Sequence, residues 1–569
     1  MRQHIALTFA LLLSGAAVFG QNLNPTVEVT NTYEGTLSGL VKPQQPVHLP
    51  DSLTRFNLDF DYAVFENPYK GAYEFRPYMV QLRPTAAPST ENRFYLKAGA
   101  GYSMHPIVEL LWTPVASKGF RVNLYADHHS YMGYYRGISP VMDTELGGNT
   151  FSDDGSRPAG ADIDTRAGVV GTYQWAGGEV GVDLSYRNLY VERKELAHRL
   201  DNGFQAEAWV RSLTGSKSAF QYDARVRYGL RGEELGRHSG AGLPDIASNV
   251  YESRIDFDGT FGPTLPIGRL LLDVDGTILR HGSYNEYYDD GSFYTGRLGV
   301  APHLEFTAGA WLFDLGARFS TLIRPKDAGE NYQHRSGFVF PEVRIDYRLL
   351  DDALVLQTSA RGGDHVNGYF DLVDRHHLML QQEAPLDNSV ERIRTMIGAR
   401  GRISGRFQYD LQLGYARWNG ALLEAWTGAE MPYFAPAAYN HLFAELSAAW
   451  RSEHVDVNAR MAYGWNDLSE DGVFAPAAFR GAARAAWHWG KRIEAGADVD
   501  WSTRREMTLS GIAYRIPGYA DLGVFGDLAL TRHFALWLRV SNLLNQTIQR
   551  GALYAENGIY FTAGIRLNF

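Results

Sequence analysis

Residues 558–569, GIYFTAGIRLNF, alternate between two kinds of side chain along the whole stretch. One set consists of Ile559, Phe561, Ala563, Ile565, Leu567 and Phe569, and the other of Tyr560, Thr562, Gly564, Arg566 and Asn568. Successive side chains of a β-strand point to opposite faces of the sheet, so the pattern predicts a strand with one apolar and one polar face. The stretch also ends on an aromatic residue, whereas chain ends are usually polar and frayed.

The same alternation recurs along most of the chain. Val180, Val182 and Leu184, for example, alternate with Asp183 and Ser185. These segments run to about ten residues, the length that a tilted strand needs to cross a bilayer, whereas strands of soluble sandwiches usually have only five or six. We count about 22 segments. They begin near residues 93, 106, 119, 163, 178, 203, 218, 250, 268, 294, 310, 338, 353, 391, 405, 439, 453, 479, 492, 519, 533 and 558.

The connections between these segments fall into two alternating classes. Short ones such as AGG, SGR and WGK alternate with longer ones, among them 131–162, 191–202 and 363–390. Outer-membrane barrels have short periplasmic turns and longer extracellular loops, and a closed barrel satisfies every backbone polar group in lipid. Residues 92–569 are therefore predicted to form one transmembrane antiparallel β-barrel of about 22 strands.

Composition excludes several classes of function. Aromatic residues make up 13% of the chain, and 59 glycines accompany them, which favours strands and turns. The net charge of −10 argues against general binding of nucleic acids. The sequence contains no cysteine, which excludes disulfides, thiolate metal sites and cysteine nucleophiles.

The start of the chain predicts export. Residues 1–20 carry Arg2, an apolar run from Ile5 to Leu13 and small residues toward Gly20, which is the pattern of a signal peptide. No apolar run long enough for a membrane-spanning helix follows. Residues 21–91 include KPQQPVHLP, which predicts an extended periplasmic or lumen segment. We therefore expect the protein in the outer membrane of a Gram-negative cell, in contact with its lipid.

The polar faces of the segments are predicted to point into a wet lumen. Its predicted lumen-facing charges are Arg121, Asp183, Asp223, Arg225, Asp256, Asp258, Asp273, Asp275, Asp410, Asp456, Arg460 and Arg566. The aspartates of the pairs 256/258 and 273/275 form either an acidic patch or, as we favour, ion pairs with Arg254 and other arginines.

The last two segments resemble the C-terminal end of TonB-dependent receptors. Residues 534–549, FALWLRVSNLLNQTIQ, contain the Asn-Leu-Leu-Asn pattern at 542–545, and the final segment ends on an aromatic residue. The resemblance implies a 22-strand barrel with an occupied lumen. Those receptors place a folded plug before the barrel, and residues 21–91 are too few for it. The chain thus resembles a plugless relative of a kind found in Bacteroidetes-type bacteria.

Two further short segments resemble functional signals. Residues 25–32, PTVEVTNT, resemble a TonB box, which implies that Thr26, Val27, Glu28, Val29 and Thr30 pair with TonB through strand addition; a chance match in a short strand or tail is the alternative. Thr562, Gly564, Leu567 and Phe569 match the signal by which similar barrels are recognised by the barrel-assembly machinery.

The aromatic stretch 55–84 is expected to line the lumen, extend the periplasmic rim or dock a periplasmic partner.

No catalytic constellation emerges from the sequence. Asp127, His128, His129 and Ser130 form one polar cluster, and Asp374, His376 and His377 form another. Adjacent histidines of an extended chain point to opposite faces, and the sequence lacks HExxH and GxSxG motifs. The SDDGS and DDGSF stretches at 152–156 and 289–293 are predicted to be polar turns. We therefore predict no enzyme, no cofactor and no metal site.

Two functions remain open from the sequence. The first is a barrel of TonB-receptor type for uptake or passage of a solute across the outer membrane. The second is a non-transporting structural or accessory subunit of a multi-protein outer-membrane complex. A barrel this wide needs either an occupant or a partner to avoid leaking, and the sequence shows no ligand motif that would identify a substrate.

Overall fold

The computed structural model describes residues 93–569, apart from 103, 118, 195, 213–219, 238–245, 284–291, 324–335, 380–387, 429–430 and 491. The predicted signal peptide at 1–20, the segment 21–91 with its TonB-box-like residues, and most of the turn at 289–293 lie outside the described residues.

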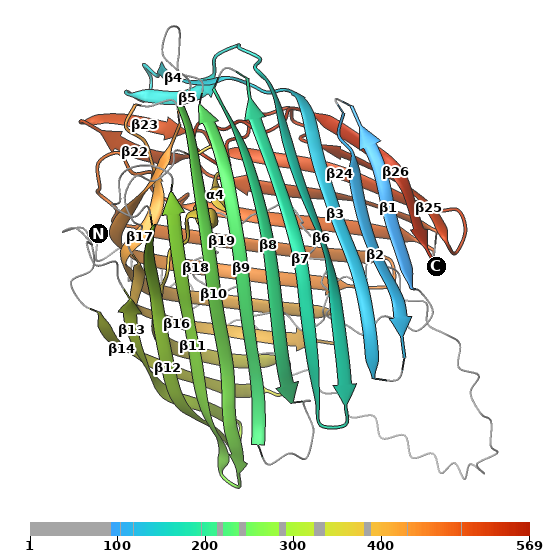
Figure 1. Ribbon diagram of the computed structural model, residues 1–569, viewed down its shortest axis with the longest axis vertical. Helices are drawn as coiled ribbons and strands as arrows, with labels where there is room; N and C mark the ends of the chain where they lie inside the picture. The colour runs from blue at the N-terminus through green and yellow to red at the C-terminus, as the bar shows by residue number, and fades with distance from the viewer. Residues whose placement is uncertain are drawn as a thin grey trace, which may run out of the picture. The chain divides into compact units, whose positions relative to one another are not determined.

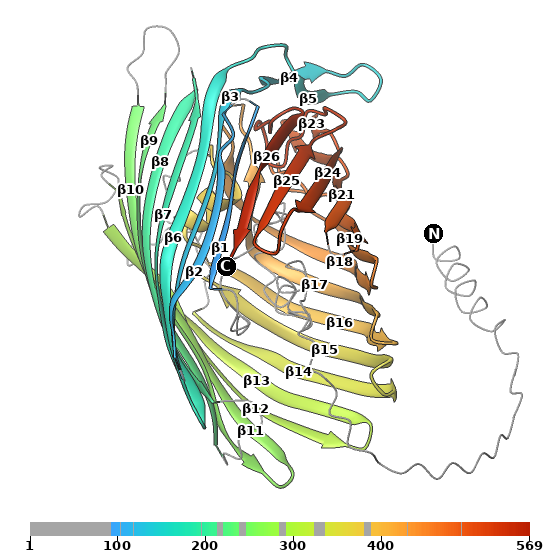
Figure 2. The same ribbon diagram turned by 90° about the vertical axis from the view of Figure 1, so that its right-hand side faces the viewer.

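Twenty-two antiparallel strands form one closed barrel, as the alternating pattern predicted (Figures 1 and 2). Consecutive barrel strands pair with one another, and β1 also pairs with β26, which closes the cylinder. The seam sets Tyr95 opposite Asn568 and Gly101 opposite Thr562. Closure leaves no free sheet edge, so every strand backbone can pair within the bilayer.

The barrel strands are β1 (Phe94–Gly101), β2 (Ile107–Ala116), β3 (Phe120–Tyr134), β6 (Ala159–Trp175), β7 (Gly178–Arg193), β8 (Ala197–Ser212), β9 (Phe220–Arg237), β10 (Ile246–Leu265), β11 (Gly268–Ser283), β12 (Ser292–Ala308), β13 (Trp311–Ile323), β14 (Gly337–Leu350), β15 (Leu354–His365), β16 (Ser389–Ile403), β17 (Phe407–Ala425), β18 (Tyr433–Arg451), β19 (Val455–Asn466), β20 (Phe479–Trp489), β21 (Ile493–Ser502), β24 (Tyr519–Ala529), β25 (Phe534–Ser541) and β26 (Tyr560–Asn568).

The exposure of side chains follows the predicted alternation. On β7, Val180, Val182 and Leu184 are 38–45% exposed, whereas Asp183 between them is only 4% exposed. Exposed leucines, valines and aromatics of this kind recur around the barrel, for example Ile397 on β16 and Leu536 on β25. In an outer-membrane barrel this exposed apolar band is the surface that faces lipid.

Several strands continue beyond the length that the bilayer requires. β9 has 18 residues and β10 has 20, whereas a crossing takes about ten. The predicted loop at 191–202 is therefore wrong: β7 runs to Arg193 and β8 begins at Ala197, with Val191 opposite Arg199. The polar-apolar alternation is lost there because buried residues such as Val191 and Leu189 pack against other parts of the loop end.

A second, four-stranded sheet lies at the loop end of the barrel (Figure 2). It consists of β4 (Ile138–Met142), β5 (Asn149–Asp153), β22 (Arg505–Leu509) and β23 (Ile512–Ile516). β5 and β23 pair in parallel, with Asn149 opposite Tyr514. Phe151, Trp426, Phe474, Met507 and Ile516 are buried together with it. Loops from distant parts of the chain are thus joined into one layer at this end of the barrel.

Among the described residues the only helix is α4 (Tyr369–Arg375), in the connection between β15 and β16. No helix of the described chain combines the length and the apolar character that a membrane crossing needs.

Candidate functional site

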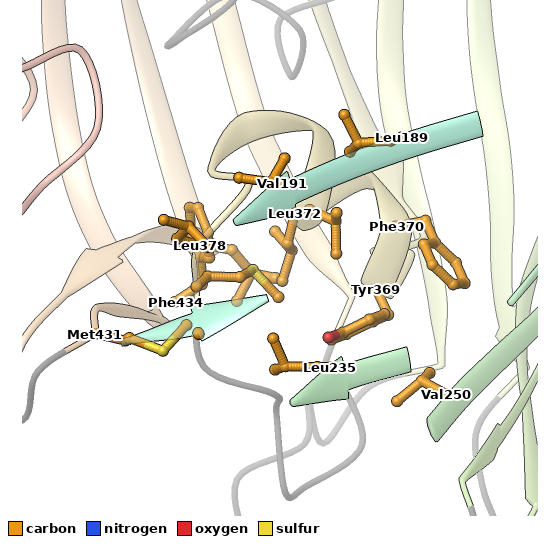
Figure 3. Packing of buried hydrophobic residues seen from close by; sticks show 14 residues of the cluster. Leu189, Val191, Leu235, Val250, Tyr369, Phe370, Leu372, Leu378, Met431 and Phe434 are labelled. Carbon is orange, nitrogen blue, oxygen red and sulfur yellow. The ribbon is translucent and has the colours of Figure 1, made fainter. Parts of the chain in front are cut away.

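Helix α4 lies inside the mouth of the barrel. Its buried side chains Tyr369, Phe370, Leu372 and Val373 pack in one cluster (Figure 3). The cluster also includes Leu189, Val191, Ala197, Leu235, Val250, Leu378, Met379, Leu422, Met431 and Phe434, which come from β7–β10, β17, β18 and the adjacent loops. Strands β11–β16 separate β10 from β17, which amounts to about 34 Å of wall at about 4.8 Å per strand spacing. A single cluster can join these walls only across the interior.

The helix is short, and its ends are fixed by other parts of the chain. At its start the Tyr369 backbone N–H donates to Glu252 of β10 (2.8 Å), and Gly368 N–H donates to Asp371 of the first turn (3.3 Å). A carboxylate at this end is also favoured by the helix dipole. At its end His376 N–H donates to the Leu372 carbonyl (2.9 Å). An isolated helix of this length is unstable in water, so its contacts with the walls maintain it.

Three arginines of one wall bind the two carboxylates of the helix. Asp374 accepts hydrogen bonds from Arg187 of β7 (2.5 Å) and Arg231 of β9 (3.0 and 3.1 Å). Asp371 accepts one from Arg254 of β10 (2.8 Å). Bonds between ionised groups are among the stronger ones in proteins, and here they are partly shielded from water.

A buried ion pair supports the same wall below the helix. Arg199 of β8 is fully buried and its Nε lies 3.0 Å from the Glu233 carboxylate of β9. Its guanidinium also donates to the carbonyls of His377 (2.6 Å) and Met379 (2.9 Å), and the Tyr369 hydroxyl donates to Glu233. The pair therefore binds the helix and the residues that follow it. Removing one partner would leave a buried charge alone, which is strongly destabilising.

The opposite wall holds the C-terminal side of the helix. Arg375 donates to the Leu422 carbonyl of β17 (2.8 Å) and its guanidinium lies over the Phe434 ring of β18 (4.4 Å). His376 Nε2 bonds to the Ala552 carbonyl (2.8 Å), in the connection between β25 and β26. Burial lowers the pKa of His376 below its usual value, so the ring is neutral at pH 7.

The histidines of the two polar clusters found in the sequence have different hydrogen-bond partners. His376 bonds within the mouth, whereas His128 of β3 contacts Thr165 (2.8 Å) and Ser130 (3.1 Å), and His129 contacts Asp127. Arg187 of β7 lies between the two clusters, because it donates both to Asp374 and to Asp164 of β6, which is opposite His129 in the strand register. Among the described residues no three histidine, aspartate or glutamate side chains are grouped to hold a metal ion.

The predicted lumen charges lie on the strand faces opposite the exposed apolar band, and many have partners. Asp256 pairs with Arg254 (2.8 Å), and Asp275 pairs with Arg297 and Arg318. The other partnered residues are Asp183 with Tyr125, Arg225 with Glu207, Asp273 with Thr260, Asp410 with Gln412, Asp456 with His488 and Arg566 with Asp527. Arg121, Asp223, Asp258 and Arg460 have no ion pair within 4.0 Å in the described chain.

The residues of the predicted assembly signal lie along the barrel seam. Thr562 is buried, and Gly564 is so close to β1 that a Cβ there would lie 2.0 Å from the Ala98 carbonyl oxygen. The Phe569 backbone N–H donates to the Phe94 carbonyl (2.8 Å), and its ring stacks on His533 (5.2 Å between centroids). Recognition of these residues by an assembly machinery stays a prediction.

The sequence did not reveal the α4 site. Its apolar residues span too few positions to show a helical period, and its arginine partners lie more than a hundred residues away. The one available signal was the NGYFDLVDR stretch, in which a turn-forming Asn-Gly precedes an apolar pair and two aspartates.

Comparison with known proteins identifies the fold. No family model matches the sequence, and no curated protein matches it. Among solved structures, the copper transporter OprC superposes with a TM-score of 0.63 at 11% identity, covering 84% of this chain and 81% of that one. The FrpB iron transporter of Neisseria meningitidis gives 0.62 at 10% identity, covering 84% and 81%. The ferripyoverdine receptor of the Pseudomonas aeruginosa outer membrane gives 0.62 at 11%, covering 85% and 72%.

The chain has the fold of these two transporters and this receptor. At such low identity the likeness concerns the fold and leaves the solute unassigned. The closed barrel of 22 strands, with its exposed apolar band, places the protein in the outer membrane.

Proposed function

We propose that this protein passes a solute across the outer membrane through its barrel, and that helix α4 closes the pathway at the extracellular end. The observation that carries the proposal is the single cluster in which α4 joins β7–β10 to β17 and β18 across the interior. A scaffold barrel has no need of such a bridge. A transport pathway needs a gating element that stays docked when the pathway is closed and undocks when a few bonds are broken.

Some of the contacts that hold α4 against the barrel wall can be broken by a competing ligand. Beside the apolar cluster and the other hydrogen bonds described above, the contacts of α4 include the ion pairs of Asp371 and Asp374 with arginines, and a solute or partner can compete for these arginines. The helix belongs to a connection and is not a strand of the barrel, so it can move while the barrel stays closed.

Conductance in planar bilayers tests this proposal. Asp371→Asn and Asp374→Asn together remove the charges that hold the helix, while Glu145→Gln removes a charge from an exposed hairpin elsewhere at the loop end. We expect larger or more frequent open currents from the double variant, and wild-type behaviour from the control. Equal currents in all three proteins, with the double variant correctly folded by heat-modifiable gel mobility, would contradict gating by α4.

We also propose that residues 21–91 act in place of a folded plug, as in a plugless relative of Bacteroidetes type, and that Thr26–Thr30 pair with TonB. The support is the sequence of this segment and the likeness of the barrel to transporters and receptors. Val27→Pro removes a backbone N–H and should abolish cross-linking to TonB, because strand addition requires that donor. Glu28→Gln, which keeps the backbone, is the control.

A further inference from the structure

One tight turn in the connection between β25 and β26 contacts two parts of the mouth. The turn consists of residues Gly551–Tyr554, and an isolated bridge joins its first and last residues. It contacts the end of helix α4, and it also contacts the four-stranded sheet of β4, β5, β22 and β23, here called the cap sheet (Figure 2). The contacts on each side show how movement of the one part affects the other.

The turn holds α4 through His376, the first residue after the helix. His376 Nε2–H donates to the Ala552 carbonyl (2.8 Å), and the Leu378 backbone N–H donates to His376 Nδ1 (3.2 Å). Both ring nitrogens thus have partners, which fixes the orientation of the ring. Gly551 lies so close to this ring that a Cβ added there would lie 2.5 Å from its Cδ2 atom. A larger residue at 551 must therefore displace either the turn or the ring.

Tyr554, at the end of the turn, binds both the helix side and the barrel wall. Its ring packs edge-on against His376, with 5.9 Å between the ring centroids and 70° between the planes. Its hydroxyl donates to Asp162 of β6, and the Arg193 guanidinium of β7 lies 4.6 Å from its ring centroid. Its ring also packs against the hydrophobic cluster around α4. The turn is thus anchored to the wall at the place where it contacts the helix.

The same turn belongs to the core of the cap sheet. Ala552 is fully buried in the hydrophobic cluster of that sheet, and Leu553 packs against the same cluster. Just before the turn, the Gln549 side-chain amide donates to the Phe151 carbonyl of β5 (2.9 Å). Ala552 therefore packs into the cap sheet through its side chain and binds the α4 side through its carbonyl, so the two contacts move together.

The backbone of this turn is held in an unusual conformation. The φ angle of Leu553 is 63°, in the left-handed region that residues other than glycine rarely adopt. Such a conformation persists only where the surrounding contacts enforce it, and residues of this kind gather at switch regions. Here the cap cluster and the anchored Tyr554 lie on the two sides of Leu553. Loss of either set of contacts lets the turn relax, which changes the geometry of the other set.

We propose that the Gly551–Tyr554 turn is a latch through which the cap sheet controls the docking of α4. The inference rests on the proposed function, because it names the regulation of the closure by α4. A ligand that displaces the cap sheet shifts the turn, and the shifted turn releases His376. The end of β17 also reaches both hydrophobic clusters, through Leu422 and Trp426, and so provides a second route between the cap sheet and the helix.

A double-mutant cycle on the full-length protein in detergent tests this coupling. The readout is hydrogen exchange of residues 366–379 at pH 7. Phe151→Ala removes a ring from the cap cluster and touches no member of the cluster around α4, whereas Gly551→Ala displaces the latch from His376. We expect Phe151→Ala to raise the exchange rate about fivefold or more, a typical strength of coupling between two sites. It should add little once Gly551→Ala is present, because the route is already broken.

Three further variants guard against general loosening of the mouth. Gln549→Ala is a milder change of the cap side, since it removes only the bond to the Phe151 carbonyl, and it should also raise the rate. Phe338→Ala truncates a ring of the same size in a separate cluster of β13, β14 and β16. Gly337→Ala adds a Cβ that has nothing within 4 Å. Both should exchange as the wild type does, and heat-modifiable mobility shows that each barrel has formed.

The outcomes separate the latch from the proposed function. Unchanged exchange of residues 366–379 in Phe151→Ala and Gln549→Ala would overturn the latch, and additive effects of Phe151→Ala and Gly551→Ala would assign the coupling to β17 instead. In either case larger currents from the Asp371→Asn and Asp374→Asn double variant would still support gating by α4. Faster, non-additive exchange together with equal currents in every variant would support the latch and contradict gating.

Discussion

Arg231 of β9 and Asp374 of helix α4 meet through hydrogen bonds of 3.0 and 3.1 Å, although 143 residues separate them along the chain. Arg231 also binds Asp201 of β8, and Asp374 also binds Arg187 of β7. The carboxylate of the helix thus completes a network on the inner wall, and this network determines where the helix docks. The ion pair is the most direct point at which to test the closure of the mouth.

Asp374→Asn should release the helix. Loss of bonds between charged groups costs about 1.5–3 kcal/mol, which corresponds to about a tenfold or larger rise in the undocked population. Because cleavage of a transiently opened segment follows that population, trypsin should cut after Arg375 about tenfold faster. Mass spectrometry of the fragments measures the rate. Glu145→Gln should cleave as the wild type does, and an unchanged rate in Asp374→Asn would show that the apolar cluster alone holds α4.

Acid should loosen the same segment through His376. Burial keeps the pKa of this ring below its ordinary value of about 6.5, so the undocked state takes up the proton first as the pH falls. The docked state is therefore fully favoured above that value and loses stability below it. Glu424 opposes the shift, whereas Arg199 and Arg505 reinforce it.

Hydrogen exchange of residues 366–379, corrected for the intrinsic rate, measures this effect at pH 7 and pH 5. We expect faster exchange at pH 5 in the wild type and a smaller difference between the two conditions in His376→Gln. An equal pH response in the two proteins would assign the acid sensitivity to other groups.

Gly564→Ala should impair closure of the barrel seam. An added Cβ would lie 2.0 Å from the Ala98 carbonyl oxygen and 2.5 Å from the Gly99 Cα, so the strands must move apart. Gly229→Ala is the control, since Gly229 also lies on an inward face but has nothing within 4 Å of its added Cβ. The heat-modifiable fraction in membranes should fall for Gly564→Ala alone. Equal fractions for the two variants would mean that the seam tolerates this displacement.

Deleting Phe569 should lower the level of assembled barrel. The deletion removes the aromatic end of the predicted assembly signal and the carbonyl that accepts from Phe94 N–H (2.8 Å). Phe569→Ala separates the two effects, because it keeps the backbone and loses only the ring that stacks on His533. We expect both variants to assemble poorly and Phe569→Trp to assemble well. Normal assembly of Phe569→Ala would leave seam pairing as the only role of this residue.

The sequence alone determined the barrel, because the residues of each strand alternate between apolar side chains that face lipid and polar side chains that face the lumen. The alternation of Val180, Val182 and Leu184 with Asp183 is local and needs no knowledge of the partner strand. The alternation of short and long connections then indicated the topology. Many strands begin at or near their predicted positions, as at Gly178, Gly268 and Phe479, whereas β8 and β18 begin six residues earlier than predicted, at Ala197 and Tyr433.

Tertiary structure alone decided how the mouth is arranged. The parallel pairing of Asn149 with Tyr514 and the docking of α4 depend on which strands are neighbours after closure. These contacts join residues of low local propensity across long stretches of chain, and their stability comes from burial and ion pairing in the closed barrel. The alternation along a strand cannot predict these contacts, since it indicates whether each side chain faces lipid or the lumen and not which residue lies next to it.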